Sequence, residues 1–416
     1  MLTADFFVRN IRTLVTPEGP APLAGSTQRA VRVINDAAVA SLNGRIVFVG
    51  TDADCTARVS ATEGAATIDA CGRAVVPGFV DPHTHVVFAG DRREELRRRL
   101  AGAGYAEIAA EGGGIVKTVR ATREASEESL AVQTRARLAE MLRAGTTTAE
   151  AKSGYGLATD AEVKMLRVVR RLGGEQPIDL VPTFLGAHEV PLEYRENRRG
   201  YIDLLTREMI PAIAAERLAA WCDVFCETGV YTPGESREVL EAGLAHGLRP
   251  RIHADELARS GGAQVAADLG ARSADHLLFV ERADADRMAA AGVVATLLPI
   301  AAFYLKLGRF APARMLIDAG VPVALATDLN PGGGFSPSMP AAMTFGCFGM
   351  KMTFEEALTA ATLNAAYSIG VDADCGSLEA GKLMDAVLVG GEPVDLLRLG
   401  APVIAAVIKK GRVVSR

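Results

Sequence analysis

The chain has 416 residues, of which 49% are hydrophobic, so it is long enough to bury a large core. Its formal net charge is −5 and its sequence pI is about 5.8, which gives no reason to expect a nucleic acid or an anionic membrane as a partner. No apolar run approaches transmembrane length, and the first residues do not resemble a secretory signal. The six cysteines have no paired spacing, so we expect reduced thiols in a cytoplasmic protein.

Both ends of the chain have the texture of β structure. Residues 1–74 consist of short strand-like runs separated by Gly, Pro and Asn-Gly signals, and the same texture returns in residues 375–416. We therefore expect these two ends to form one small, discontinuous β-sandwich domain. Residues 75–374 would then form a separate catalytic domain.

The middle of the chain alternates between strand-like and helical patterns. Helical spacing of apolar residues is found at 130–144, 160–172, 201–219, 233–246, 260–269, 281–291, 312–319 and 353–370. Apolar strand-like runs end at about residues 81, 151, 187, 227, 254, 276, 299 and 328. Eight strands that alternate with helices predict an α/β fold of the (β/α)8 TIM-barrel type.

The first of these strands leads into two histidines. Its apolar run continues as Asp81-Pro82-His83-Thr84-His85. Residues i and i+2 of a strand point to the same side, so His83 and His85 project together. Two imidazoles placed in this way provide half of a metal site, and the remaining ligands must come from distant parts of the chain.

Three further histidines lie at the ends of predicted barrel strands. They are His188, His253 and His276, whereas His246 lies late in a predicted helix, where it would cap carbonyl groups. A lone histidine is usually structural, but five at the C-terminal face of one barrel are hard to explain in that way. Because this face carries the chemistry of such barrels, we expect the active site there.

A carboxylate after the last strand completes a metal-binding set. The predicted ligands are His83, His85, His253 and Asp328. Such a nitrogen and oxygen set suits zinc, and ferrous iron is also compatible. A divalent ion held there would activate water for hydrolysis, and Asp328 is placed to accept the proton of that water.

Two more residues are candidates for proton transfer. Glu256 follows His253 closely, so it is either a group that polarises water or handles a substrate N–H, or a carboxylate that stabilises a helix N-terminus. His276 is expected to stabilise a developing oxyanion or to shuttle a proton.

Residues that follow the predicted strands suggest a substrate that bears a carboxylate. Arg92 and Arg93 follow the first strand closely, and a guanidinium binds a carboxylate in a fork. Tyr105 lies in the same long segment, and Tyr155 lies in the SGYGL motif after the second strand. Asn330, Gly332 and Gly333 belong to LNPGGG, directly after Asp328, where an amide and backbone N–H groups could contact the substrate.

The motifs taken together resemble a known family. GFVDPHTH, HAD, ATD and the closing GSLEAGKLMDAVLV are similar to the amidohydrolase superfamily. HTHVVFAGDR, AKSGYGL, TFLGAHEVP, DVFCETGV, IHADEL and DLNPG are similar to its imidazolonepropionase family, which acts in histidine degradation. These motifs run in order from about residue 77 to 335.

The resemblance implies roles for the candidate residues. It matches His83, His85, His253 and Asp328 to metal ligands, and Glu256 and His276 to the surroundings of the reactive water. The residues that it matches to substrate-binding positions are Arg92, Tyr105, Tyr155, His188, Asn330 and Gly332. Gly333 departs from the family, in which a hydroxyl residue is common at that position. Binuclear barrels use a carboxylated lysine at the fourth strand, and none stands beside Glu227, so we expect a single metal ion.

The resemblance also implies a reaction and an assembly. The expected reaction is hydrolysis of the ring amide of 4-imidazolone-5-propanoate to N-formimidoyl-L-glutamate by a cytoplasmic homodimer. Either Asp328 or Glu256 would deliver the proton to the leaving nitrogen. One alternative is a deaminase of a cyclic amidine, such as a purine-like heterocycle, which would use the same metal site and release ammonia. A second alternative is a non-catalytic relative, which should have lost metal ligands.

Overall fold

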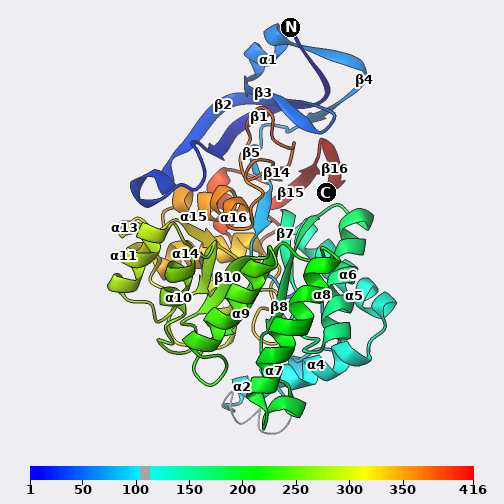
Figure 1. Cartoon of the computed structure of the whole chain (residues 1–416). Coiled ribbons are helices and arrows are strands. Elements are labelled where there is room, and N and C mark those ends of the chain that lie inside the picture. The colour runs from blue at the N-terminus through cyan, green and yellow to red at the C-terminus, as the bar shows by residue number, and fades with distance from the viewer. Residues whose placement is uncertain (104–112) are drawn as a thin grey trace.

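The computed structural model describes residues 1–103 and 113–416 of the chain. A barrel of alternating strands and helices makes up its larger part, and a small sheet lies at one end of the barrel (Figure 1). The N- and C-termini both lie at this small sheet. None of the described helices is long and apolar enough to cross a membrane, and all six cysteines are free.

The barrel consists of eight strands in chain order, each parallel to its neighbour. They are β6 (Phe79–Asp81), β7 (Thr146–Lys152), β8 (Asp179–Ala187), β9 (Trp221–Cys226), β10 (Arg249–Ala254), β11 (Ser273–His276), β12 (Val294–Leu297) and β13 (Val323–Leu325). Helices cover the outside of this sheet, and side chains fill its inside, so most strand residues are buried. The predicted (β/α)8 barrel is confirmed.

The first and last strands meet through the segments that follow them. The backbone N–H of Asp328 donates to the His83 carbonyl (3.1 Å), and that of His85 donates to the Leu329 carbonyl (2.9 Å). Asp81 reinforces this seam, because its carboxylate accepts hydrogen bonds from the backbone N–H and the hydroxyl of Thr327. The contacts that close the barrel therefore also bring the two histidines of the first strand beside Asp328.

Helices alternate with the strands largely as predicted. The longer ones are α2 (Arg93–Leu100), α4 (Ile115–Glu124), α5 (Glu127–Arg143), α6 (Thr159–Glu175), α9 (Pro233–Ala245), α10 (Gly262–Leu269), α11 (Arg282–Ala291) and α14 (Met339–Met350). The shorter ones are α7 (Arg198–Leu204), α8 (Ile210–Ala215), α12 (Pro299–Tyr304), α13 (Ala313–Asp318), α15 (Phe354–Ala360) and α16 (Leu363–Ser368).

Two predicted helices differ in detail from the structure. The segment 201–219 is α7 and α8 joined by a π-helical turn, Leu205–Met209, and it ends at Ala215. The segment 353–370 is divided into α15 and α16, because Thr362 has a non-helical backbone (φ −134°, ψ −88°). Helix α14 was not predicted, since its uniformly apolar sequence includes Pro340 and two glycines, which hide any helical period.

Strands from both ends of the chain form the small sheet. They are β1 (Leu2–Pro17), β2 (Val31–Leu42), β3 (Arg45–Thr51), β4 (Val59–Asp69), β5 (Ala74–Pro77), β14 (Ala386–Val389), β15 (Ile404–Lys409) and β16 (Arg412–Ser415). A short helix, α1 (Asp52–Arg58), packs on it. The eight strands share one mixed sheet, with apolar clusters around Phe6 and around Phe7. The small β domain built from both chain ends is thus confirmed.

The strand pairing marks where the small sheet gives way to the barrel. β5 pairs with β1 and β14, whereas β6, one residue later, pairs with β7 of the barrel. Gly78 stands between them, and a Cβ there would lie 2.4 Å from the Thr147 hydroxyl, so only glycine fits. The division into residues 1–74 with 375–416 and 75–374 remains a prediction, and the pairing favours Gly78 as its first boundary.

Candidate metal centre and active site

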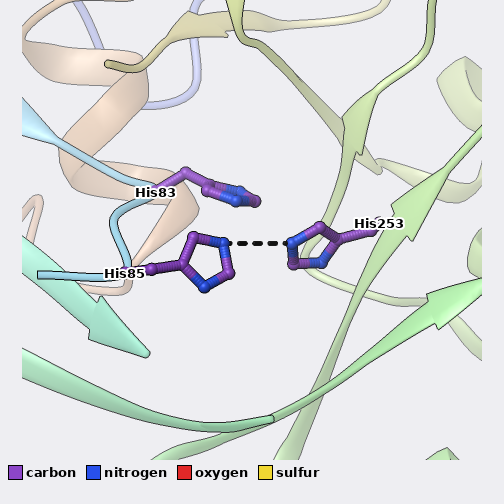
Figure 2. A group of neighbouring side chains, drawn as sticks. All are labelled: His83, His85 and His253. Carbon is purple, nitrogen blue, oxygen red and sulfur yellow. Dashed lines mark hydrogen bonds between the residues drawn. The ribbon is translucent and has the colours of Figure 1, made fainter. Parts of the chain in front are cut away.

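The structure brings together the five histidines that the sequence placed at strand ends. His83 lies at the centre, with its ring centroid 4.5 Å from that of His253, 5.3 Å from that of His85 and 5.5 Å from that of His276. The rings of His85 and His188 are stacked, with 4.9 Å between centroids. Figure 2 shows the imidazoles of His83 and His85, from the segment after β6, and that of His253, from β10, pointing toward one another.

Three of these histidines, His83, His85 and His253, together with Asp328 surround a space of the size that a metal ion needs. The Nε2 atoms of His85 and His253 are 3.5 Å apart. Asp328 Oδ1 lies 3.5 Å from His85 Nε2 and 3.6 Å from His83 Nε2. Ligand atoms about 2.1 Å from a tetrahedrally coordinated ion are about 3.4 Å from one another. His83, His276 and Asp328 form a second, overlapping group with similar spacing.

The donor atoms at this space support a metal ion as its occupant. His83 Nε2 and Asp328 Oδ1 are buried and have no hydrogen-bond partner in the described part of the chain. Buried polar atoms are rarely left unpaired, because each then loses its hydration without compensation. A divalent cation would satisfy both atoms, so these residues fit a metal ion. The assignment of each residue as a metal ligand remains a prediction.

Burial sets the protonation state of the histidines. It lowers the pKa values of His83, His85 and His276 well below the ordinary value, with smaller effects from neighbouring charges. It also lowers that of His188, to about 3. These imidazoles are therefore neutral at pH 7, as metal ligands and hydrogen-bond acceptors must be.

The two acidic candidates shift in the opposite direction. Burial raises the pKa of Asp328 to about 7. Burial, followed by repulsion from Asp328 and Glu227, raises the pKa of Glu256 well above its ordinary value. Burial therefore favours the protonated form of the Glu256 carboxyl, whose Oε1 lies 3.5 Å from His276 Nδ1.

Two of the predicted ligands are held by carboxylates that the sequence analysis missed. Asp275 Oδ2 is 2.7 Å from His83 Nδ1, and Asp223 Oδ1 is 3.1 Å from His253 Nδ1. Because each Nδ1 is engaged, each Nε2 is directed at the metal space. Their sequence signal is a charged residue inside an otherwise apolar strand, as in WCDVFC, where Asp223 is fully buried.

A cavity of about 380 Å³ opens from the histidines toward the residues proposed to bind substrate. Its polar lining includes His85, Arg92, Tyr155, His188, His253, Glu256, His276, Asp328 and Asn330, and its backbone lining includes Gly332 and Gly333. Its apolar lining includes Phe225, Leu257 and Leu305. Tyr105 lies outside the described residues.

The loop after the last strand carries its own internal support. The Asn330 side chain donates to the Asp328 carbonyl (2.8 Å) and accepts from the N–H groups of Gly332 and Gly333 (2.7 Å each). A Cβ at Gly332 would lie 2.3 Å from Arg92 Nη1, so the glycine lets the guanidinium approach the loop. At Gly333 a Cβ would lie 3.1 Å from Leu305, which crowds the position where the family has a hydroxyl residue.

Glu227, the residue considered for a second metal ion, faces backbone amides. Its carboxylate accepts hydrogen bonds from the N–H groups of Leu257 (2.8 Å) and Thr228 (2.7 Å). It therefore supports the turn that carries Glu256. These contacts favour the prediction of a single metal ion.

Comparisons with known proteins agree with the geometry of the site. The family model for the amidohydrolase family matches residues 74–414. A protein named imidazolonepropionase from Shouchella clausii is 47% identical over 98% of this chain and 92% of its own length. Another of that name, from Geobacillus thermodenitrificans, is 50% identical over 91% of this chain and 90% of its own length.

Solved structures show the same fold at much lower identity. An adenosine deaminase from Xanthomonas campestris with bound zinc is 21% identical, covers 99% of this chain and 93% of its own, and has a TM-score of 0.73. A guanine deaminase from E. coli is 17% identical over 99% of each chain, with a TM-score of 0.74. At this identity the likeness concerns the fold, whereas the near-full-length relatives show that the chain belongs to the amidohydrolase family and, within it, to the imidazolonepropionases.

Proposed function

We propose that the protein hydrolyses the ring amide of 4-imidazolone-5-propanoate to N-formimidoyl-L-glutamate. The observation that carries this proposal is a single cavity that joins the histidine centre to Arg92. The end with the histidines and Asp328 suits metal-dependent hydrolysis, and the end with Arg92 suits the carboxylate of a substrate. Near-full-length identity of 44–50% to proteins named imidazolonepropionase supports the same substrate.

The proposed metal centre has His83, His85, His253 and Asp328 as ligands. Bound there, a zinc or ferrous ion would supply Lewis-acid polarisation of the ring carbonyl and a water of lowered pKa. The chain itself provides three neutral imidazoles and one carboxylate, and it excludes bulk water, since all four side chains are buried. The zinc-bound adenosine deaminase of the same fold supports a divalent ion as the occupant.

Protons would move between residues that line the cavity. As the water oxygen attacks the ring carbonyl carbon, Asp328 takes up the proton that the water loses. His276 would donate to the developing oxyanion from Nε2, with its Nδ1 turned to Glu256 Oε1 at 3.5 Å, where burial favours a protonated carboxyl. Glu256 would then give its proton to the ring nitrogen as the C–N bond breaks, so that the amidine nitrogen leaves in its neutral form.

The propionate of the substrate would bind at the opposite end. Arg92 is fixed by its Nε–H donating to Glu95 Oε2 (2.7 Å), and it lines the cavity beside Gly332. His188 faces the carbonyl of Gly154 through Nδ1 (3.0 Å), so that atom donates and Nε2 remains an acceptor for a substrate N–H. Tyr155 and the ring of His188 lie side by side, 5.2 Å between centroids, as one wall of the ring pocket.

The test compares the proposed substrate with those of the deaminase alternative. Metallated protein is given 4-imidazolone-5-propanoate, guanine or adenosine, and both substrate loss and ammonia are measured. We expect turnover of the imidazolone without ammonia, abolished by chelation and restored by zinc or ferrous iron. Ammonia release from guanine or adenosine at comparable kcat/KM would establish the deaminase instead.

We also propose a cytoplasmic homodimer, as the family resemblance implies. The six free cysteines, none of which is paired, support a reducing compartment. Light scattering coupled to size-exclusion chromatography tests the assembly: a dimer of this chain has twice its 43.7 kDa mass. A single peak at the monomer mass at all concentrations would contradict it.

A further inference from the structure

Beneath the metal space lies a group of five charged side chains with no exposure to solvent. They are Glu150 and Lys152 on β7, Asp223 on β9, Arg251 on β10 and Asp275 on β11. Fully buried charges are costly unless each is paired and hydrogen-bonded. Nothing in the proposed chemistry uses the two cations of this group, so their presence in the centre of the barrel calls for another role.

Lys152 is the member that joins the others. Its Nζ lies 2.6 Å from Asp223 Oδ2, 2.7 Å from Glu150 Oε1 and 3.8 Å from Asp275 Oδ2. Arg251 completes the group, donating from Nη2 to Asp275 Oδ2 (3.2 Å) and to the Pro82 carbonyl (2.9 Å). A single ammonium thus faces carboxylates from three different strands.

Two of these carboxylates continue to the predicted metal ligands. Asp223 binds Lys152 with one oxygen and His253 Nδ1 with the other. Asp275 Oδ2 faces both Lys152 and His83 Nδ1. Asp223 and Asp275 therefore lie between one buried cation and the two imidazoles, whereas His85 is supported by stacking on His188.

We infer that Lys152 is a positioning residue for the metal centre, which holds the Asp223 and Asp275 carboxylates in the orientation that aims His253 and His83 at the ion. This inference rests on the metal site of the proposed function and adds a residue to it. The two short ion pairs of Lys152 leave it no freedom to become a metal ligand.

Without the ammonium, the carboxylates lose the partner that fixes them. The group would then contain three carboxylates against the single charge of Arg251, and Asp223 would be left with one free, buried oxygen. Such a carboxylate rotates or takes up a proton, and either change releases His253 Nδ1. Changes to residues that orient metal ligands typically weaken metal binding by about 10- to 100-fold.

The chain offers a matched control for this substitution. Lys409 is also buried and paired with two carboxylates, at 2.6 Å from Asp385 and 2.8 Å from Asp179, but it lies in the small sheet. Lys152→Met and Lys409→Met each remove one buried cation. Zinc affinity is measured by competition with a chelator, and the unfolding midpoint of the metal-free protein is measured separately.

We expect the two variants to differ in zinc affinity. Lys152→Met should weaken zinc binding by about 10- to 100-fold, whereas Lys409→Met should stay within about two-fold because it is distant from the ligands. Both should unfold at lower temperature. Unchanged zinc affinity in Lys152→Met, or equal weakening in both variants, would show that Lys152 acts only on general stability.

Two further measurements cover the case in which Lys152→Met does not fold. Lys152→Gln keeps a hydrogen-bond donor without the charge and should show the same weakened zinc binding. In the unsubstituted metal-free protein, nitrogen-15 spectra should show His83 and His253 protonated at Nδ1, and protonation at Nε2 in either would overturn the inference. Failure of the proposed function is distinguishable, because the unsubstituted protein would then bind zinc without turning over the imidazolone.

Discussion

At the scale of single residues, we expect Arg92 to be needed for substrate binding but not for metal binding. Its guanidinium lines the cavity and is held by Glu95, whereas the neighbouring Arg93 is exposed. A charge-assisted hydrogen bond contributes about 1.5–3 kcal/mol, so Arg92→Ala should raise KM for 4-imidazolone-5-propanoate by about 10- to 100-fold. Zinc content should not change.

Arg93→Ala is the matched control for this prediction, since it removes an adjacent but exposed guanidinium. Its KM should equal that of the unsubstituted protein. Steady-state kinetics with metal analysis provides the measurement. An ordinary KM in Arg92→Ala would remove Arg92 from the substrate site.

The raised pKa of Asp328 predicts how pH controls metal binding. In the metal-free fold this carboxyl, with a pKa of about 7, carries a proton below neutrality. The pKa values of His83 and His85 are lowered, so these ligands are already neutral. The proton on Asp328 must leave when an ion binds, so apparent zinc affinity should rise about tenfold per pH unit up to about pH 7 and then level off.

Chelator competition between pH 5.5 and 8.5 measures this dependence. Asp328→Asn removes the titrating group and should give weaker binding with a much flatter pH profile. If the unsubstituted protein bound zinc equally at pH 5.5 and 7, Asp328 would not be the group whose proton competes with the metal.

At the scale of elements, one glutamate on α6 holds the loop that carries Tyr155. The buried Glu162 carboxylate accepts hydrogen bonds from the N–H groups of Gly154 (2.9 Å), Gly156 (2.7 Å) and Leu157 (2.8 Å). Glu162→Ala leaves three buried donors unpaired, so the free energy of unfolding should fall by at least about 2 kcal/mol. KM should rise as the loop loosens, with zinc affinity unchanged.

Asp160→Ala, an exposed acidic position in the first turn of the same helix, is the control and should leave both stability and KM nearly unchanged. Urea unfolding gives the stability difference. Loss of zinc binding in Glu162→Ala, with KM intact, would contradict the assignment of this loop to the substrate end of the cavity.

The sequence predicted most barrel elements, because buried parallel strands appear as apolar runs and their ends carry the histidines. It predicted the last strand to about residue 328, whereas β13 ends at Leu325. The difference arises because Asp328 is held by closure contacts with the His83 segment, which sequence periodicity does not show. The five histidines could be predicted since each follows its own strand.

The buried charges could not be found in the same way. Glu150, Lys152, Asp223, Arg251 and Asp275 appear in the sequence as isolated polar residues on four different strands. Their significance depends on which strands are neighbours and on how far each side chain reaches across the barrel. Only the folded arrangement shows that they form one group beneath the metal space.

At the scale of the whole molecule, metal binding should be coupled to global stability. The ligands come from β10 and from the segments after β6 and β13, so the ion joins parts of the chain that unfolding separates. Free zinc at about 1,000 times its dissociation constant should stabilise the fold by about 4 kcal/mol. In His253→Ala, thermal unfolding should show little or no such increase. An equal increase in both proteins would place the zinc elsewhere.

The central claim is that water attacks the ring carbonyl, and the fate of the water oxygen tests it most directly. Turnover of 4-imidazolone-5-propanoate in oxygen-18 water is followed by mass spectrometry and carbon-13 NMR of the product. The account predicts N-formimidoyl-L-glutamate with one oxygen-18 atom in the newly formed α-carboxylate and no ammonia. Ammonia release, or oxygen-18 on the carbon between the two ring nitrogens, would show attack at the amidine carbon and contradict it.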